Sequence, residues 1–464
     1  MAFTDDLRKA SEIIRSASAV TILSHIDADG IASEAILRQA VSRLDIQTRS
    51  VFLRQLEPLM MKWVPKDDTL KIFVDLGAGQ QNLIEEHGLV EDEVLILDHH
   101  ISQPSNIEYR QVNCLPYGIG KLSAAGIAYF VAREMDSKNR DLAKLGVVGN
   151  VGDMMAREAC GLVGPAREIA LDGVTAGNVR ITTHDLNCYG LSTRPIHICL
   201  SYSDDPIIPG ISNNPNGAQA FLERLGITLR ETDGRWRVWE ELPDEERRTI
   251  ASAIVEQLIA HGEPVNRIFG ESYIFPDEAP RSPLRNASEY ATMLNACGRW
   301  ARPDIGSAVC TGDRDLQYRK AEHMLRHHRS VIRELFQYIL DTGVARTDNL
   351  QWIHTGDRFP DTIVGIGAGM ALSKLDWKRP IMVFCTLPDD PEVVKVSMRT
   401  VERVVARGID LQAALCEASE RVGGAGGGHA IAAGAYIPAG TEEVFVREID
   451  DILARQSSPC AENS

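Results

Sequence analysis

The stretch from Thr21 to Gly30 brings together residue types that bind metal ions. It begins inside an apolar run, residues 19–23, which is typical of a short buried strand. His25, Asp27 and Asp29 follow at alternate positions, so an extended backbone directs their side chains to one face. Such a face is too charged to be buried without a partner, and a divalent cation is the simplest partner. The stretch therefore predicts a metal site at the C-terminal end of a strand, where open α/β sheets bind ligands.

Two further apolar runs end in the same residue types. One leads into Asp75, and the other leads into Asp98, His99 and His100. A glycine-rich stretch then precedes Asp153, and its three glycines allow the backbone to approach closely. Because parallel strands end at one edge of a sheet, we expect these groups to converge there. The residues expected at this edge are His25, Asp27, Asp29, Asp75, His99, His100 and Asp153.

Oxygen and imidazole ligands without thiolates suit Mn²⁺ or Mg²⁺ better than a structural Zn²⁺. Two such ions about 3.5–4 Å apart, sharing one carboxylate, polarise a phosphoryl group and activate water at neutral pH. The alternative is a set of unrelated helix caps and surface acids. The repeated placement at strand ends favours the metal site over that alternative.

The elements that position these residues alternate between strand and helix over residues 1–160. The expected strands are Ala19–Ser24, Arg49–Leu53, Lys71–Val74 and Val94–Leu97, and a long helix is expected over Leu122–Glu134. This alternation predicts an α/β fold with a parallel sheet and helices on both faces.

Composition narrows the class of protein. The chain of 464 residues is 44% hydrophobic and 25% charged, which is ordinary for a globular protein of two or three domains. The sequence contains no run of 18 apolar residues, so it predicts no membrane span. Residues 1–6 do not resemble a secretory signal. Nine cysteines without a CxxC pair suggest reduced thiols, so we expect a cytoplasmic protein without a membrane partner. The net charge of −16 argues against general nucleic-acid binding but leaves room for a local basic groove.

The middle of the chain is less regular, and turn-forming residues mark its start near 161–165. We interpret it as an inserted subdomain. A long basic helical stretch, residues 313–333, follows it, and this stretch either tracks a nucleic-acid backbone or is a solvated helix face.

The chain becomes α/β again from about residue 345. A strand over 392–399 ends with Ser397 and Arg399, and a glycine-rich loop containing Gly426, Gly427 and Gly428 leads to His429. We expect this loop to open a helix of small residues. Glycine density of this kind brings backbone N–H groups against an anion, which predicts a phosphate-binding site. The spacing matches neither a Walker A loop nor a Rossmann fingerprint.

Four motifs resemble those of the DHH phosphoesterase superfamily, namely SHIDADG at 24–30, VDLG at 74–77, LDHH at 97–100 and GNVGD at 149–153. That superfamily includes RecJ-type exonucleases, nanoRNases, cyclic-dinucleotide phosphodiesterases and one class of pyrophosphatases. The resemblance implies two Mn²⁺ ions, with Mg²⁺ as the alternative. It implies that His25 and Asp27 hold one ion, while Asp29, His99 and Asp153 hold the other.

The same resemblance implies roles for three further residues. Asp75 bridges the two ions, and His100 contacts the scissile phosphate or assists the leaving oxygen. Asp98 orients a ligating histidine. The pair SMR at 397–399 and GGGH at 426–429 is similar to a DHHA1 domain, which implies that Ser397, Arg399, the three glycines and His429 bind substrate.

Three segments of the middle region resemble the archaeal RecJ-like nucleases, namely residues 191–197, 204–210 and 283–299. Members of that group associate with the GINS complex of the replicative helicase and are related to a eukaryotic helicase subunit. The resemblance implies an exonuclease specific for single strands, acting on DNA and also on RNA in replication or repair. Two alternatives stay open: an enzyme for nanoRNA, cyclic dinucleotides or phosphoadenosine phosphate, and a replication-complex scaffold with weak activity.

The expected organisation combines these parts into an N-terminal parallel-sheet DHH domain and a smaller C-terminal α/β DHHA1 domain. An inserted subdomain and a connecting helix lie between them in the chain. The boundaries that we predict are 1–165 for the DHH domain, 166–285 for the insert, 286–340 for the connecting helical region, 341–455 for the DHHA1 domain and 456–464 for a tail.

Overall fold

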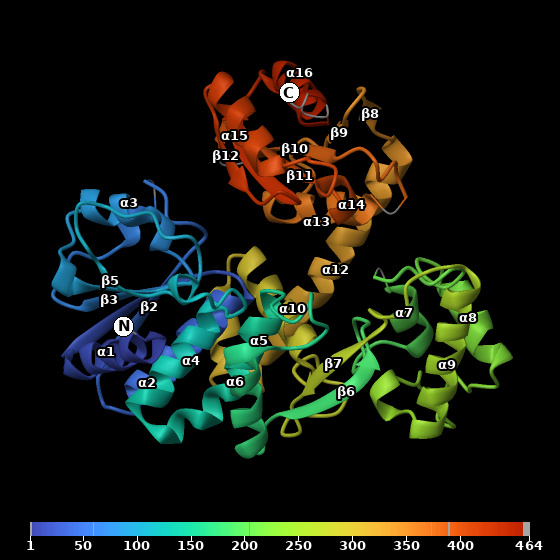
Figure 1. Cartoon of the computed structure of the whole chain (residues 1–464), viewed down its shortest axis with the longest axis horizontal. Helices are drawn as coiled ribbons and strands as arrows, with labels where there is room; N and C mark the ends of the chain where they lie inside the picture. Colours follow the sequence, from blue (N-terminus) through green and yellow to red (C-terminus); the bar gives the residue numbers. More distant parts are fainter. Residues whose placement is uncertain (1, 59, 204, 373, 388–389, 458–464) are drawn as a thin grey trace, which may run out of the picture. The chain divides into compact units, whose positions relative to one another are not determined.

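The computed structural model describes residues 2–58, 60–203, 205–372, 374–387 and 390–457 (Figure 1). Asp204 and most of the predicted tail, residues 458–464, lie outside this description. The chain divides into two compact units, residues 1–325 and 326–464, which are described separately below. One long helix, α12 (Leu316–Thr342), spans the division.

The N-terminal unit contains the parallel sheet predicted from the sequence. Its order is β2-β1-β3-β4-β5, and every pair is parallel. The strands are β1 (Ala19–His25), β2 (Gln47–Leu53), β3 (Leu70–Val74), β4 (Val94–Leu97) and β5 (Arg110–Val112). The sequence reasoning missed β5 because two of its three residues are polar, which leaves no apolar run. The order reverses between β1 and β3, and such switch points are where doubly wound sheets bind ligands.

Helices cover both faces of this sheet (Figure 1). They are α1 (Phe3–Ser16), α2 (Ala28–Ser42), α3 (Gln81–Glu86), α4 (Ala124–Met135), α5 (Ala143–Gly152) and α6 (Gly164–Thr175). Ile22 and Ile72 point into a core shared with α1, α2, α4 and α5. The alternate residues Leu23 and Phe73 point into a second core that includes Ile84 of α3. The period of two along each strand therefore separates the two cores.

The inserted region has its own small core, with members between Leu186 and Ile268. Its elements are β6 (Arg180–Leu186), α7 (Ile196–Ser201), α8 (Pro215–Arg224), α9 (Asp244–Ala260) and β7 (Phe269–Ile274). β6 and β7 form an antiparallel pair, so the chain leaves the N-terminal core on one strand and returns on the other. Two helices follow, α10 (Ala287–Arg299) and α11 (Pro303–Cys310), and they pack into the core that lies over α2.

The C-terminal unit contains a six-stranded mixed sheet in the order β12-β13-β11-β10-β9-β8. Its elements are β8 (Ala345–Arg346), β9 (Gln351–His354), α13 (Asp361–Ala371), β10 (Ile381–Leu387), β11 (Asp390–Arg399), α14 (Glu402–Val405), α15 (Leu411–Arg421), β12 (Ala425–Gly428), β13 (Ala432–Pro438) and α16 (Glu442–Ser457). Only β9 and β10 pair in parallel. Residues 456 and 457 of the predicted tail belong to α16.

The expected helix after the glycine-rich loop is absent from the described residues, and this prediction was wrong. Residues 425–428 and 432–438 form the hairpin of β12 and β13 instead. Small residues suit this hairpin because α15 packs against it closely: a Cβ at Gly426 would lie 2.7 Å from Ser419 Oγ. The eight described cysteines are free thiols, and none of the described helices is long and apolar enough to span a membrane.

Candidate metal centre

The ends of β1 and β3 lie side by side at the switch point of the sheet. Val74 pairs with Ser24 on one side and with Leu97 on the other. Asp75, the residue after β3, is therefore a neighbour of His25. The parallel register alone brings these two side chains to the same edge.

The first group of candidate ligands comprises His25, Asp27 and Asp75. His25 Nδ1 lies 3.1 Å from Asp27 Oδ2 and 3.2 Å from Asp75 Oδ2. Asp27 is also the N-cap of α2, where its side chain accepts a hydrogen bond from the Gly30 N–H at 3.0 Å. One carboxylate oxygen of Asp27 is thus used by the helix, and the other faces His25.

The second group comprises Asp29, His99 and Asp153. His99 Nε2 lies 4.0 Å from Asp29 Oδ2 and 3.4 Å from Asp153 Oδ2. The first turn of α4 holds the Asp29 carboxylate, because the N–H groups of Ala124 and Ala125 donate to it at 2.8 and 3.0 Å. Asp153 caps the C-terminus of α5. Elements from distant parts of the sequence therefore build one set of ligands.

Asp75 contacts both groups. Besides its contact with His25, its Oδ1 lies 3.4 Å from His99 Nε2. The residue is buried and adopts a left-handed backbone conformation with φ of 59°, which Asp tolerates better than most residues. Strained backbone of this kind is concentrated at functional sites.

The carboxylates of the two groups repel one another in a poorly solvated space. Burial and the charges of Asp27 and Asp29 raise the pKa of Asp75 well above its ordinary value. Burial, together with the charge of Asp29, raises the pKa of Asp153 to about 8. Burial lowers the pKa of His25, but Asp27 and Asp75 outweigh it and raise that pKa well above its ordinary value. The site therefore carries more negative charge than its own side chains compensate.

Asp98 and His100 form a separate pair beside this centre. Asp98 Oδ1 lies 2.7 Å from His100 Nδ1, and the same carboxylate accepts hydrogen bonds from the N–H groups of His99 and Ala78. The hydrogen bond to Asp98 raises the pKa of His100. The His100 ring is half exposed and lies 4.0 Å from Asp75 Oδ1. Asp98 thus fixes the backbone of the loop and orients His100 next to the centre.

The donor set fits two divalent cations. The groups His25–Asp27–Asp75 and Asp29–His99–Asp153 each place their ligand atoms within 4.8 Å of one another. His99 Nε2 is buried, has no hydrogen-bond partner among the described residues, and faces three carboxylates. A buried polar atom without a partner is costly, and a cation at this point would satisfy it together with the carboxylates. Carboxylates suit Mg²⁺ and Mn²⁺, and imidazoles suit transition-metal ions, so this mixed set is compatible with divalent cations of either kind.

Family models match three parts of the chain. The DHH family N-terminal domain matches residues 19–149, the DHH-CID domain matches 188–270 and the DHHA1 domain matches 350–455. The chain belongs to the DHH/DHHA1 family. The candidate metal centre described above lies in the matched DHH domain, apart from Asp153, which lies shortly after the matched residues 19–149.

Relatives of known structure share the fold at low sequence identity. RecJ of Thermus thermophilus with Mn²⁺ is 15% identical, with a TM-score of 0.59, over 97% of this chain and 55% of its own. The chain thus spans about half the length of that RecJ. CDC45 of Entamoeba histolytica is 11% identical, with a TM-score of 0.62, over 97% of both chains. An uncharacterized protein of Methanocaldococcus jannaschii is 24% identical over 94% of both sequences.

The predicted substrate-binding residues of the DHHA1 domain gather at one end of its sheet. Arg399 is the last residue of β11 and pairs with Ala432 of β13. Its Nη1 donates to the carbonyl oxygens of Met398 and Ala433 at 2.8 and 3.3 Å. Gly365 of α13 makes room for the guanidinium group, since a Cβ there would overlap it. Ser397, two residues earlier, is buried within the same sheet.

The glycine hairpin presents backbone N–H groups at the edge of the DHHA1 sheet. His429 and Ala432 exchange hydrogen bonds of 2.9 and 3.1 Å, which makes them a hydrogen-bonded pair. Since such pairs alternate along an antiparallel ladder, the N–H groups of Gly426 and Gly428 point away from β13, while that of Gly427 points toward it. β12 is the edge strand, so the outward N–H groups face no further strand; Gly428 is exposed, while α15 packs beside Gly426, whose carbonyl oxygen accepts from Cys416 Sγ at 3.1 Å. The His429 side chain is exposed beside them.

Helix α10 supports the candidate metal centre, and sequence reasoning assigned it no such role. Asn295 Oδ1 accepts a hydrogen bond from the Ala28 N–H at 2.9 Å. Gly298 lets the helix approach the metal-binding segment, because a Cβ there would overlap the Ile26 carbonyl oxygen. The half-buried Arg299 interacts electrostatically with Asp27. The position of α10 within the motif 283–299 was the only signal of a functional role in the sequence. No sequence pattern links this helix to residues 26–28.

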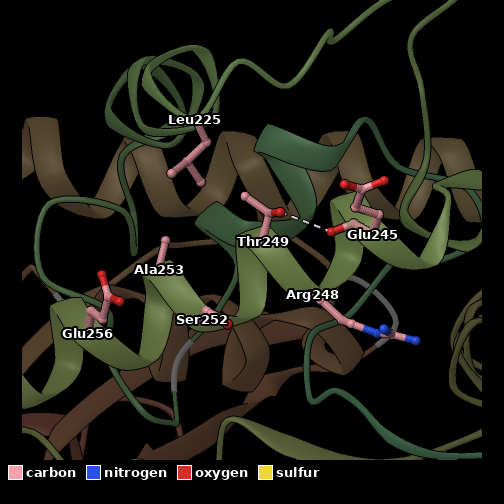
Figure 2. A pocket seen from close by; sticks show the side chains of 7 residues that line it. All are labelled: Leu225, Glu245, Arg248, Thr249, Ser252, Ala253 and Glu256. Carbon is pink, nitrogen blue, oxygen red and sulfur yellow. Dashed lines mark hydrogen bonds between the residues drawn. The ribbon is translucent and has the colours of Figure 1, made fainter.

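The DHH-CID region contains a shallow groove of a different character (Figure 2). The side chains along it include Leu225, Glu245, Arg248 and Glu256, mostly from α9. Thr249 Oγ1 donates to the Glu245 carbonyl oxygen at 2.9 Å, a bond internal to the helix. None of the groups that could hold a metal among the described residues includes these side chains.

Proposed function

We propose that this protein is a two-metal phosphodiesterase that removes nucleotides from the end of single-stranded nucleic acid, as a RecJ-like exonuclease. The observation that carries the proposal is that Asp75, a member of the first ligand group, also contacts His99 of the second group. A carboxylate that contacts both groups suits the bridge of a pair of ions. The fold likeness to RecJ supports the same reaction class.

In this proposal His25 and Asp27 hold one ion, Asp29, His99 and Asp153 hold the other, and Asp75 bridges them. Mn²⁺ is the proposed metal and Mg²⁺ its alternative, because the ligands are carboxylates and imidazoles. When bound, such a pair of ions polarises the phosphoryl group and activates the attacking water.

The protein's own side chains complete the proposed reaction. His100, whose pKa is raised by Asp98, carries a positive charge more readily and can contact a phosphate oxygen or protonate the leaving oxygen. The guanidinium group of Arg399 and the outward N–H groups of Gly426 and Gly428 suit a substrate phosphate. The exposed His429 completes that proposed substrate site, while the buried Ser397 and Gly427, whose N–H points toward β13, shape it from within the sheet. The substrate is single-stranded DNA, and RNA as well, in replication or repair, and GINS or other helicase components are proposed partners.

The decisive experiment is a degradation assay with purified full-length protein and Mn²⁺. End-labelled single-stranded DNA, single-stranded RNA and a dinucleotide are compared for the wild type, Asp75→Ala and Asp244→Asn, an exposed carboxylate on α9 that serves as control. We expect metal-dependent ladders from the long strands with the wild type and the control only. Turnover of the dinucleotide alone assigns the protein to short substrates, and full activity of Asp75→Ala refutes the metal assignment.

A replication-complex scaffold with weak activity is the second candidate. The fold likeness to CDC45 over 97% of both chains is the observation that favours it. The clustered ligands favour the enzyme instead, because a scaffold has no need for repelling buried carboxylates. Binding to GINS together with the absence of turnover in the assay above would decide for the scaffold.

A further inference from the structure

A tryptophan flanked by basic side chains lies in the C-terminal unit, and none of these side chains has been assigned a role above. The guanidinium carbons of Arg403 and Arg407 lie 5.9 and 5.6 Å from the centre of the Trp377 ring. Both arginines are exposed, as are Lys374 and Lys378. We call Trp377, Lys378, Arg403 and Arg407 the Trp377 patch.

The patch has positive charge without acidic partners. In the part of the chain that the structure describes, Lys378, Arg403 and Arg407 form no ion pair, although the whole chain carries a net charge of −16. The nearby Asp376 is engaged with Arg379 at 3.1 Å. In a protein with such an excess of acids, exposed cations without an acidic partner are available to attract an anionic ligand.

Hydrogen bonds from a buried side chain hold the turn that carries Trp377. The buried Gln351 donates from Nε2 to the carbonyl oxygens of Asp376 and Arg379, at 2.8 and 2.9 Å. Asp376 also accepts a hydrogen bond from the Lys378 N–H at 3.1 Å. A held turn limits the entropy lost when a ligand binds.

The ring orients the two arginines. A guanidinium group that packs over an aromatic ring keeps its N–H donors directed outward in its own plane, where they can bind phosphate oxygens. Arg403 lies in α14, and Arg407 lies in the turn that follows, where its N–H donates to the Val404 carbonyl oxygen at 3.0 Å. The patch therefore presents two forked donors on one aromatic support.

The patch lies at the sheet end that carries the proposed phosphate site. Ile381, four residues after Trp377, pairs with Arg399. Thr400, just before α14, donates its N–H to the Ile431 carbonyl oxygen in the turn of the glycine hairpin, at 3.0 Å. A polyanion that has one phosphate at Arg399 can thus continue toward the patch within the same unit.

We propose that the Trp377 patch binds the phosphodiester backbone of a single strand at nucleotides other than the one being cleaved. Arg403 and Arg407 contact phosphates, and Trp377 is a positioning residue for them. This proposal rests on the proposed function for the identity of the ligand. It makes the enzyme prefer long strands over dinucleotides, because a longer strand has additional phosphates for the patch to bind.

The test separates strand binding from turnover. Binding of a fluorescent 20-nucleotide single strand to the full-length protein is measured without Mn²⁺ over a range of salt concentrations. We expect the double variant Arg403→Ala/Arg407→Ala to bind about 10-fold or more weakly, with a salt slope smaller by about 1.4, since each phosphate contact on a single strand contributes about 0.7. Arg447→Ala, which removes an exposed cation of α16 paired with Glu443, is the control and should bind normally.

Two further variants test the role of the ring. Trp377→Phe should keep most of the affinity and Trp377→Leu should lose it, with unchanged melting temperature in the first case. In the degradation assay the double variant should lose activity on the 20-mer but keep its kcat/KM on a dinucleotide.

Unchanged affinity and salt slope of the double variant overturn the proposal, as does an equal loss on both substrates. A wild type that binds the strand through these arginines but cleaves nothing refutes the proposed function and leaves the patch standing. A wild type that binds no single strand overturns the patch.

Discussion

The side-chain oxygen of Asn295 lies 2.9 Å from the backbone nitrogen of Ala28 and accepts its hydrogen bond. This bond joins the middle of α10 to the residue between two candidate metal ligands, Asp27 and Asp29. Ala28 is the first residue of α2, so its N–H has no acceptor within that helix. Asn295 supplies that acceptor and restrains the segment that carries both carboxylates.

Replacing Asn295 by alanine should loosen the metal centre. We expect a loss of about 1–3 kcal/mol in unfolding free energy, because the Ala28 N–H loses its partner. Mn²⁺ affinity, measured by calorimetry, should fall as well. Thr292→Ala on the same helix removes only a bond to the Ser288 carbonyl oxygen and is the matched control. Equal Mn²⁺ affinities in the two variants would show that Asn295 is merely structural.

Asp75→Asn should abolish turnover but stabilise the metal-free protein. The pKa of Asp75 is raised by burial and by its acidic neighbours, so its ionised form opposes folding above the ordinary pKa of Asp. Asparagine removes that charge and tolerates the left-handed backbone. In EDTA we expect Tm to rise by about 2–4 °C, and addition of Mn²⁺ to raise it less than in the wild type.

Asp67→Asn provides the contrast for that prediction. The hydrogen bond from Thr69 lowers the pKa of Asp67 to about 2, so its charge favours the folded state at neutral pH. Its removal should lower Tm in EDTA, without an effect on Mn²⁺ binding. A lower Tm for both variants would contradict the assigned repulsion at Asp75.

Gly149→Ala should damage the Asp29 ligand through packing. A Cβ at this position would overlap the Ala125 side chain and lie 2.5 Å from Asp29 Oδ1. We expect a net destabilisation of about 1–3 kcal/mol, although alanine itself favours the helix by about 1 kcal/mol, together with weaker Mn²⁺ binding. At Gly152 an added Cβ would lie 3.0 and 3.1 Å from the Cβ atoms of Ala28 and Ala291. Gly152→Ala should therefore lower both the stability and the Mn²⁺ affinity less than Gly149→Ala does. Urea unfolding and calorimetry of the two variants test the order.

The ion-pair network of Glu278 should make stability depend on pH in the acid range. Burial raises the pKa of Glu278, but hydrogen bonds from Arg314 and Lys144 outweigh it and lower that pKa below its ordinary value. Its contribution is therefore complete above about pH 4.3, the ordinary pKa of Glu, and is lost as the pH falls through the lower folded value.

Glu278→Gln should lower the unfolding free energy by about 3 kcal/mol at pH 7, because it leaves the buried Lys144 and the Arg314 charge without their main partner. The difference from the wild type should shrink as the pH is lowered below about 4.3. Asp277→Asn, which removes the half-exposed second partner of Lys144, should cost less than about 1 kcal/mol. A difference in unfolding free energy between Glu278→Gln and the wild type that does not change with pH would contradict the ion-pair network assigned to Glu278.

The sequence by itself determined the first sheet and the edge at which its polar residues emerge. Buried parallel strands need continuous apolar runs, and a run that stops at His25, Asp75 or Asp98 marks the end of the strand. The parallel order then brings these ends together, so local pattern was sufficient for this part of the site. Strand β5 was not predicted because its three residues do not form an apolar run.

Only the tertiary structure decided what surrounds that edge. Asn295 lies 267 residues from Ala28 in the sequence. Gly149 of α5 packs against Asp29 of α2, with the strands β2 to β5 and two helices between them in the chain. The glycine-rich segment became a hairpin because its pairing with β13 and its contact with α15 outweighed any local preference of its small residues. Glycine and alanine carry little side-chain information, so their conformation follows from the partners that the fold brings to them.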